Sequence, residues 1–222
     1  MTEPAPDAPL SVPDAIAHRR SVRHFAPTPV PDEVVERLLR LAVCAPSSWN
    51  LQPWRIVVVR DAATRERLAA ACFHQPQVVE APVVFVFAIE IGGWRGTIDD
   101  VVRTAVDEGA WSEPYVASYR KYAPSSQQSL GESLREYDTK DALIAATHLA
   151  LAAESLGYGS CFMNGYSEEK VKAVIGAAER PDIGVSLVLP VGVPSDRGRN
   201  PGRLPLSRTA FVEGLDRPWP RA

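Results

Sequence analysis

Three arginines and a serine stand close together near the start of the chain, in the run Arg19, Arg20, Ser21, Val22, Arg23. Each guanidinium group offers a planar fork of donors that can bind a phosphate or polarise a carbonyl, and a neighbouring hydroxyl can complete such a site. The same cations would also stabilise the end of a preceding helix by complementing its dipole. The run therefore predicts either an anion site or a helix cap, and the spacing alone favours the cap.

A second polar cluster lies at 45–54, where the sequence APSSWNLQPW stands directly before an apolar run. Amide and hydroxyl groups at the entrance of a strand suit the recognition of a flat heterocycle that carries both donors and acceptors. The alternative is a turn whose serines and asparagine bond their own backbone while the tryptophans pack on the core. Taken alone, the cluster slightly favours the turn.

A third group of polar residues follows two predicted strands. It comprises the segment 159–166 and the C-terminal arginines Arg197, Arg199 and Arg203. Ligands of layered α/β proteins gather at strand ends, so these arginines could add a second anion contact. For Arg197 and Arg199 a plain surface role is an equally good interpretation.

Several kinds of chemistry lack their sequence signatures. The chain has no glycine-rich dinucleotide fingerprint, no phosphate-binding P-loop and no nucleophile elbow, and its four histidines and three cysteines are scattered without metal-ligand spacing. We therefore expect no metal site and no disulfide framework, which favours a reducing, cytoplasmic setting. With 24 basic and 27 acidic residues, no charge excess favours nucleic acid or a membrane surface. Small molecules are the expected ligands.

Apolar periodicity predicts alternating strands and helices. Short β-branched or apolar runs predict strands over 54–60, 82–91, 159–164 and 183–193. Helical patterns predict one helix that ends near residue 19, and others over 31–45, 62–72, 141–156 and from 167 onward. Because a helix separates the first two strands, the order suggests a βαβ-like layering within an α+β or α/β fold. The apolar run at 82–91 is too short to cross a membrane.

The organisation along the chain predicts one domain over residues 13–222, after a flexible tail at 1–12 that is acidic and rich in proline. Between 92 and 138 the apolar pattern weakens, and only short helical pieces are predicted, around 101–106 and 115–122. This variable segment could form a lid over a site, with its aromatic residues either selecting flat ligands or anchoring the segment to the core. Residues 194–222 form a C-terminal extension that is expected to wrap over another surface.

In chain order, RRSVRHF, APSSWNLQPWRIVVV, EAPVVFVFA, LGYGSCFMNGYSEEKVKAVIG, LPVGVP and GRLPL resemble the nitroreductase family over about 15–206. The resemblance implies an α+β fold of three layers, α/β/α, in which helices flank a central mixed sheet. It also implies an intertwined homodimer with two FMN sites at the subunit interface. It is weakest over 92–138.

The resemblance assigns the cofactor site by position. The residues that match FMN-binding positions are Arg19, Arg20, Ser21, Arg23, Pro46, Ser47, Ser48, Asn50, Gln52, Asn164, Gly165, Arg199 and Arg203. The first four match the segment at the phosphate, the ribityl chain and one ring edge, and those at 46–52 match a loop from the partner subunit. Asn164 and Gly165 match a backbone segment near the reactive edge, and Arg203 matches a phosphate contact.

Two positions depart from the family pattern. Pro201 stands where relatives often carry a lysine, so either Arg199 replaces that contact or the contact is lost. His74 and Gln77 align with an asparagine and a lysine that contact the flavin in some relatives. The resemblance leaves open whether these two side chains reach the flavin.

The activity implied by the resemblance is hydride transfer from NADH or NADPH through FMN to a small organic acceptor, such as a nitroaromatic or a quinone, in a ping-pong cycle. No catalytic side chain is assigned, and Arg23 is expected to tune the flavin by stabilising its anionic reduced form. One alternative is another reaction on the same fold: dehalogenation, ring oxidation or flavin fragmentation. No tyrosine in 92–138 has a glutamate four residues earlier, which disfavours dehalogenation. A non-catalytic flavin-binding protein and a structural domain are the remaining alternatives.

Overall fold

The computed structural model describes residues 8–219 of the chain. Its main sheet has four strands in the order β2-β3-β5-β4, and a separate two-stranded ribbon pairs β1 with β6. The strands of the main sheet are β2 (Trp54–Val59), β3 (Val83–Glu90), β5 (Ile183–Gly192) and β4 (Gly159–Ser160). The ribbon consists of β1 (His24–Phe25) and β6 (Pro194–Asp196).

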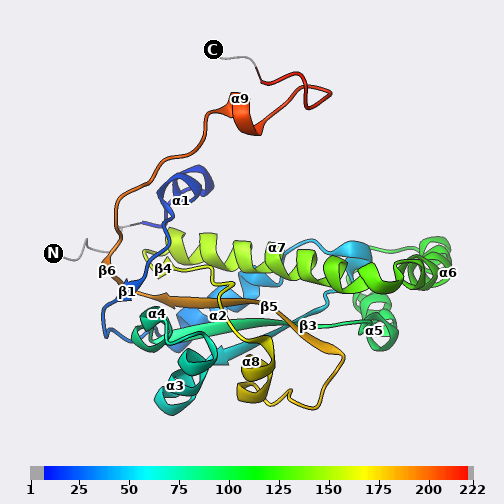
Figure 1. Cartoon of the computed structure of the whole chain (residues 1–222). Coiled ribbons are helices and arrows are strands. Elements are labelled where there is room, and N and C mark those ends of the chain that lie inside the picture. Colours follow the sequence, from blue (N-terminus) through cyan, green and yellow to red (C-terminus); the bar gives the residue numbers. More distant parts are fainter. Residues whose placement is uncertain (1–7, 220–222) are drawn as a thin grey trace.

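Helices cover both faces of the main sheet, which gives the three layers of an α/β/α fold (Figure 1). The helices are α1 (Val12–His18), α2 (Asp32–Ala42), α3 (Ala62–Ala71), α4 (Pro76–Glu80), α5 (Trp94–Asp107), α6 (Glu113–Ser129), α7 (Leu134–Ser155), α8 (Glu168–Val174) and α9 (Leu206–Thr209). Short 3-10 turns lie at Ser48–Asn50 and Gly131–Ser133. None of the helices within residues 8–219 is long and apolar enough to cross a membrane.

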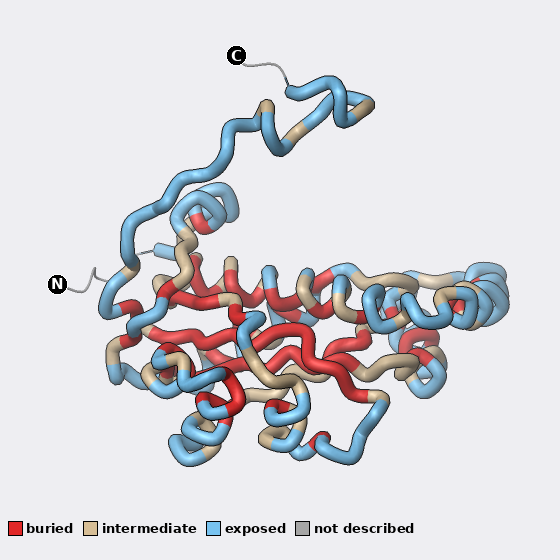
Figure 2. The backbone as a smooth tube through the Cα atoms, viewed as in Figure 1, coloured by how far each residue is buried: buried red, intermediate tan, exposed pale blue. Residues whose placement is uncertain are grey.

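The apolar run of β3 explains how the layers are held together. Its alternate residues Phe85 and Phe87 pack with α2 and α7 on one face, while Val84 and Val86 pack with α3, α4 and α8 on the other. Because both faces of the strand are covered, no polar alternation is needed, and the strand reads as a continuous hydrophobic run. Figure 2 shows the buried backbone concentrated in these central strands and in the side of α7 that faces them.

Helix α7 is the longest helix described, with 22 residues. Small or compact side chains at Ala142, Ala145, Ala146 and Leu149 have no exposed surface and allow the helix to lie close to the sheet. The helix ends at Ser155, and Gly157, two residues further on, has a φ of +86°, the left-handed conformation that commonly stops a helix. The prediction of a buried alanine-rich helix is confirmed, although the helix begins seven residues earlier than the expected position 141.

Some predicted elements differ from the structure. The strands β2 and β3 are antiparallel neighbours, so the βαβ-like layering was wrong, and the pairs β3–β5 and β4–β5 are antiparallel as well. A parallel bridge between Ser21 and Ser160 makes the sheet mixed. The strand expected over 159–164 pairs regularly only at Gly159–Ser160, with one further bridge from Met163 to Val188.

The segment 92–138 contains the long helices α5 and α6 in place of the two short pieces predicted for it. In α5, residues Ile98, Val101 and Val102 follow the three- and four-residue spacing of a helix and pack toward α6. Few apolar residues mark α6, which also contains Pro124. The weak apolar signal of α6 explains why the sequence suggested a looser segment.

The C-terminal arm (residues 197–219) leaves the body of the molecule after β6 (Figure 1). It includes α9 and exposes Leu204, Leu206 and Leu215 to 67%, 63% and 84%. At the other end, residues 1–7 of the predicted tail lie outside the described residues. The segment 8–11, which precedes α1, contacts α7, since the Leu10 amide donates to the Ser155 carbonyl at 3.0 Å.

Candidate functional site

The arginine-rich run at 19–23 is held beside β4. Helix α1 is capped at its start by Ser11 and at its end by Arg19, which agrees with the predicted end near residue 19. The chain then bridges to the main sheet, and the Val22 amide donates to the Ser160 carbonyl at 3.0 Å. This approach requires glycine at 159, because a Cβ there would lie 2.5 Å from a methyl group of Val22. The run is therefore fixed against the edge of the sheet.

Arg19 borders a hollow of about 500 Å³. The hollow is lined by Ile16, Arg19, Ser21, Thr147, Ala150, Leu151 and Phe162. The guanidinium carbon of Arg19 lies 6.0 Å from the centre of the Phe162 ring, and its Nη1 is buried without a hydrogen-bond partner. A buried donor without an acceptor costs free energy, so this hollow suits a ligand that brings an acceptor or a negative charge.

The neighbouring arginines behave differently. Arg20 donates to the carbonyls of Ala17 and Arg19 at 2.7 and 2.9 Å, so for this residue the helix-cap interpretation holds. Arg23 is exposed and donates to the Ser21 carbonyl at 3.4 Å. Burial raises the pKa of the Cys161 thiol, and the positive charges of Arg23 and Arg19 oppose that rise. The charges of Arg19 and Arg23 therefore both favour the thiolate of Cys161, the residue before Phe162.

The segment at Asn164 and Gly165 contacts the loop before α4. Gln75 donates from Nε2 to the Gly165 carbonyl at 2.8 Å, and buried Gln77 donates to Gln75 Oε1 at 3.0 Å. His74 and Asn164 are exposed. Gln77 thus supports Gln75, which orients the backbone at Gly165. Gln75 was not predicted as a site residue, although it lies between the two aligned residues His74 and Gln77.

The polar loop at 46–52 is strained. Trp49, Asn50 and Gln52 have φ values of +52°, +55° and +49°, although none of them is glycine. Left-handed backbone costs free energy for residues with a side chain, and such strain gathers at functional sites. Within the loop, Ser47 Oγ accepts a hydrogen bond from the Gln52 amide at 3.0 Å. The loop therefore needs support from the surrounding structure.

Two helices supply that support. Asp141 of α7 accepts a hydrogen bond from the Ser48 amide at 3.0 Å, and the Tyr119 hydroxyl of α6 donates to the Trp49 carbonyl at 2.8 Å. Desolvation raises the pKa of Asp141 against the opposing effect of the Ser48 amide. Burial also raises the pKa of Tyr119 to about 12. Tyr119 therefore remains a neutral donor, and this aromatic residue of the predicted lid anchors a loop to the core.

The predicted site residues occupy three separate places within one chain. Arg19 and Ser21 border the hollow at Thr147 and Leu151, whereas the 46–52 loop is attached at Asp141, about two helical turns earlier in α7. Among residues 8–219 no hydrogen bond joins that loop to the 19–23 run.

Arg199 and Arg203 are exposed residues of the C-terminal arm. Arg203 donates to the carbonyl of Gly202 at 2.7 Å. Arg197 had no predicted partner, and its Nη1 lies 2.5 Å from a carboxylate oxygen of Glu154, a side chain with no exposed surface. Over the described residues, no group of three His, Cys, Asp or Glu side chains is arranged to hold a metal ion.

A model of the nitroreductase family matches residues 16–193, which include the 19–23 run, the 46–52 loop and Gly165. The chain belongs to the nitroreductase family. It is 36% identical over 202 residues to a Thermus thermophilus protein named NADH dehydrogenase, covering 91% of this chain and 96% of that protein. It is also 26% identical over 212 residues, 94% of each protein, to a 5,6-dimethylbenzimidazole synthase of Rhodobacter capsulatus.

Solved nitroreductase structures share the fold. A nitroreductase-like protein of Streptococcus mutans superposes with a TM-score of 0.81 at 25% identity, covering 90% of this chain and 97% of that one. A structure from Exiguobacterium sibiricum that contains FMN superposes with a TM-score of 0.82 at 24% identity, covering 96% and 100%. These similarities confirm the predicted α+β, nitroreductase-like fold.

Proposed function

We propose that this protein is an FMN-dependent oxidoreductase that passes electrons from NADH or NADPH to a small organic acceptor, such as a nitroaromatic or a quinone. Membership of the nitroreductase family supports the reaction class. The name of the Thermus thermophilus relative supports the nicotinamide donor, and the Exiguobacterium sibiricum complex supports the cofactor. Within this chain, the observation that carries the proposal is the buried, unpartnered Nη1 of Arg19 at a largely apolar hollow.

The residues around this hollow fit FMN by their chemistry. Arg19 offers a charged donor that the fold leaves without a partner, and Ser21 adds a hydroxyl to the same wall. Arginine binds phosphate through charge-assisted hydrogen bonds, while apolar walls such as Phe162 and Leu151 suit a flat ring. In this proposal Arg20 acts indirectly, because it holds the end of α1 from which the run begins.

When bound, FMN supplies the two-electron redox chemistry, and the protein supplies binding, orientation and charge. Exposed Arg23 is the proposed source of positive charge that favours the anionic reduced ring. The backbone at Asn164 and Gly165, oriented by Gln75, forms the proposed wall at the reactive edge. The nicotinamide donor and the acceptor use the same open site in turn, which makes the proposed cycle ping-pong.

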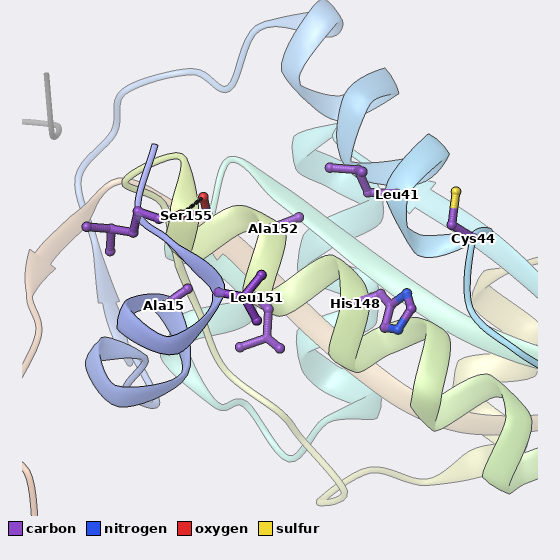
Figure 3. A pocket seen from close by; sticks show the side chains of 9 residues that line it. Ala15, Leu41, Cys44, His148, Leu151, Ala152 and Ser155 are labelled. Atoms are coloured by element: carbon purple, nitrogen blue, oxygen red, sulfur yellow. Dashed lines mark hydrogen bonds between the residues drawn. The ribbon is translucent and has the colours of Figure 1, made fainter. Parts of the chain in front are cut away.

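The proposed enzyme is a homodimer. On one face, α1, α2 and α7 expose apolar side chains, including Val12 at 69%, Leu41 at 41% and Ile144 at 39%. A hollow of about 380 Å³ lies between these helices, lined by Leu41 and Cys44 on one side and by His148 and Leu151 of α7 on the other (Figure 3). Exposed apolar patches of this kind mark protein interfaces. A second copy would bring its 46–52 loop to the Arg19 hollow and give the C-terminal arm, with Arg199 and Arg203, a surface to cover.

Light scattering of the purified protein tests this assembly. We expect the mass of a dimer, and a Leu41→Glu variant should dissociate and retain less FMN, because it buries a charge at the contact. A wild-type monomer that binds FMN fully would contradict the shared site.

The proposed domain spans residues 13–222, including the segment 92–138 as a cover over the site. The proposed compartment is the cytoplasm, because Cys44, Cys72 and Cys161 are all free thiols, as the reducing cytoplasm maintains them.

An absorption spectrum of the purified protein, recorded before and after anaerobic addition of NADH and then NADPH, tests the function. Yellow flavin bands that bleach would establish the reductase and identify its donor. Bands that persist with both donors would favour a flavin-binding protein without this activity. A colourless protein that does not bind added FMN would refute the proposal.

Arg19→Ala tests the residue that carries the proposal. Loss of a hydrogen bond to a charged group costs about 1.5–3 kcal/mol, so FMN should bind roughly 10- to 150-fold more weakly. Arg67→Ala, which removes an exposed cation from α3, is the matched control and should leave the affinity unchanged. FMN affinity is measured by fluorescence quenching. If the Arg19 variant and the control bind FMN equally well, Arg19 does not contribute to FMN binding.

A further inference from the structure

The 46–52 loop holds a conformation that its own residues disfavour. Trp49, Asn50 and Gln52 are all left-handed, and only Asn belongs to the residue types that tolerate this region well. Strained backbone of this kind persists only where its surroundings over-determine it. The contacts that hold the loop therefore decide where its polar groups point.

Two of those contacts come from side chains distant in the sequence. The Asp141 carboxylate fixes the Ser48 amide, and the Tyr119 hydroxyl fixes the Trp49 carbonyl. Tyr119 is 1% exposed, and its ring meets the Trp49 ring edge-on at 5.9 Å between centroids. Trp111 also packs against Tyr119, at 4.6 Å between ring centroids. The hydroxyl thus has a fixed direction, since two aromatic rings hold the side chain.

We propose that Tyr119 and Asp141 are positioning residues of the flavin site. They hold the strained 46–52 loop in the conformation that presents Ser47, Ser48 and Asn50 to the cofactor. This inference rests on the proposed function, since it is FMN that the loop contacts. It also assigns a role to α6, because a movement of this helix would be transmitted through the Trp49 carbonyl to the flavin loop.

The test uses full-length Tyr119→Phe, which keeps the ring contacts with Trp49 and Trp111 and removes only the hydroxyl. Tyr122→Phe is the matched control, because Tyr122 lies on the same helix and is 50% exposed. Asp141→Asn, which removes the charge from the acceptor of the Ser48 amide, is the second variant. Two quantities are measured: FMN affinity by fluorescence quenching, and hydrogen exchange of the 46–52 amides in the apoprotein.

We expect Tyr119→Phe and Asp141→Asn each to weaken FMN binding roughly five- to tenfold and to accelerate exchange of the loop amides by a similar factor. The Tyr122 control should match the wild type in both measurements. A merely structural role would lower the melting temperature without changing loop exchange or FMN affinity, and that result would overturn the inference. Wild-type affinity and exchange in both variants would overturn it as well.

Failure of the proposed function gives a different result. In that case the wild-type protein itself does not bind FMN, and the inference falls with the function. When the inference alone fails, the wild type and both variants bind FMN equally well. The wild-type titration therefore separates the two failures.

Discussion

Asp138 of α7 is a buried acid whose ionisation should oppose folding. It is 7% exposed, and its Oδ2 has no hydrogen-bond partner. Desolvation raises its pKa from 3.8 to about 6, the Gly92 amide opposes this rise, and the charge of Asp141 adds to it. The folded state therefore favours the protonated form. This contribution to stability is fully present below pH 3.8 and is lost as the pH rises through 6.

The difference between these two pKa values sets the size of the effect. About two pH units at 1.36 kcal/mol each correspond to about 3 kcal/mol lost by pH 8. Asp138→Asn removes the ionisable group, so the variant should be more stable than the wild type by up to about 3 kcal/mol at pH 8. At pH 4, where the folded wild type already holds the proton, the gain should fall below about 1 kcal/mol.

Urea denaturation at pH 4 and pH 8, at one protein concentration, measures this difference. Asp107→Asn is the control, because Asp107 is an exposed aspartate at the end of α5, and it should change stability by less than about 0.5 kcal/mol at either pH. An Asp138 variant that gains nothing at pH 8, or gains equally at both pH values, would refute the argument from desolvation.

Two further predictions concern the elements that frame the site. Gly159→Ala should destabilise the protein by about 1–3 kcal/mol in thermal denaturation, because the new Cβ would meet Val22 at 2.5 Å; an unchanged melting temperature would show that the edge of the sheet adapts. Arg197→Ala should cost about 3 kcal/mol in urea denaturation, since it leaves the buried Glu154 carboxylate without this cation. A loss below about 0.5 kcal/mol would mean that Glu154 takes up its proton or finds another partner.

Much of the fold could be predicted from local sequence signals. The strands β2, β3 and β5 lie within two residues of the predicted ranges, because apolar runs bounded by proline and glycine are strong signals. Helices α2, α3 and α8 likewise begin near the expected positions, and Ser167 caps α8. The pairing of the strands was missed, since a helix between two strands does not determine whether they become parallel neighbours.

Helix α6 was underestimated for a physical reason. Its buried positions are Tyr119, Ala123 and Gln127, which follow a four-residue spacing but include only one aliphatic side chain. An apolar pattern cannot reveal a helix whose inner face is an aromatic, a small residue and an amide. The aromatic residues of this segment could therefore be noticed in the sequence, whereas the helix that orders them could not.

In the candidate site, too, some residues could be predicted from the sequence and others could not. Arg19 could be found from its sequence context, because clustered arginines are a local signal. Asp141, by contrast, lies 93 positions from Ser48, whose amide donates a hydrogen bond to the Asp141 carboxylate. Gln75 lies 90 positions from Gly165, whose carbonyl accepts a hydrogen bond from the Gln75 side chain. No local pattern contains such pairs, and they appear only once the chain is folded.

The 46–52 loop shows how local sequence signals fail at the candidate site. Its sequence of serine, asparagine and proline fits a self-bonded turn, and the Ser47 bond to the Gln52 amide belongs to such a turn. The left-handed Trp49 and Gln52, however, contradict their own local preferences. Natural sequences violate local preferences mainly where function requires it, so the violation itself indicates a site. Because Tyr119 and Asp141 hold the backbone from outside the loop, its exposed polar groups remain available for a ligand.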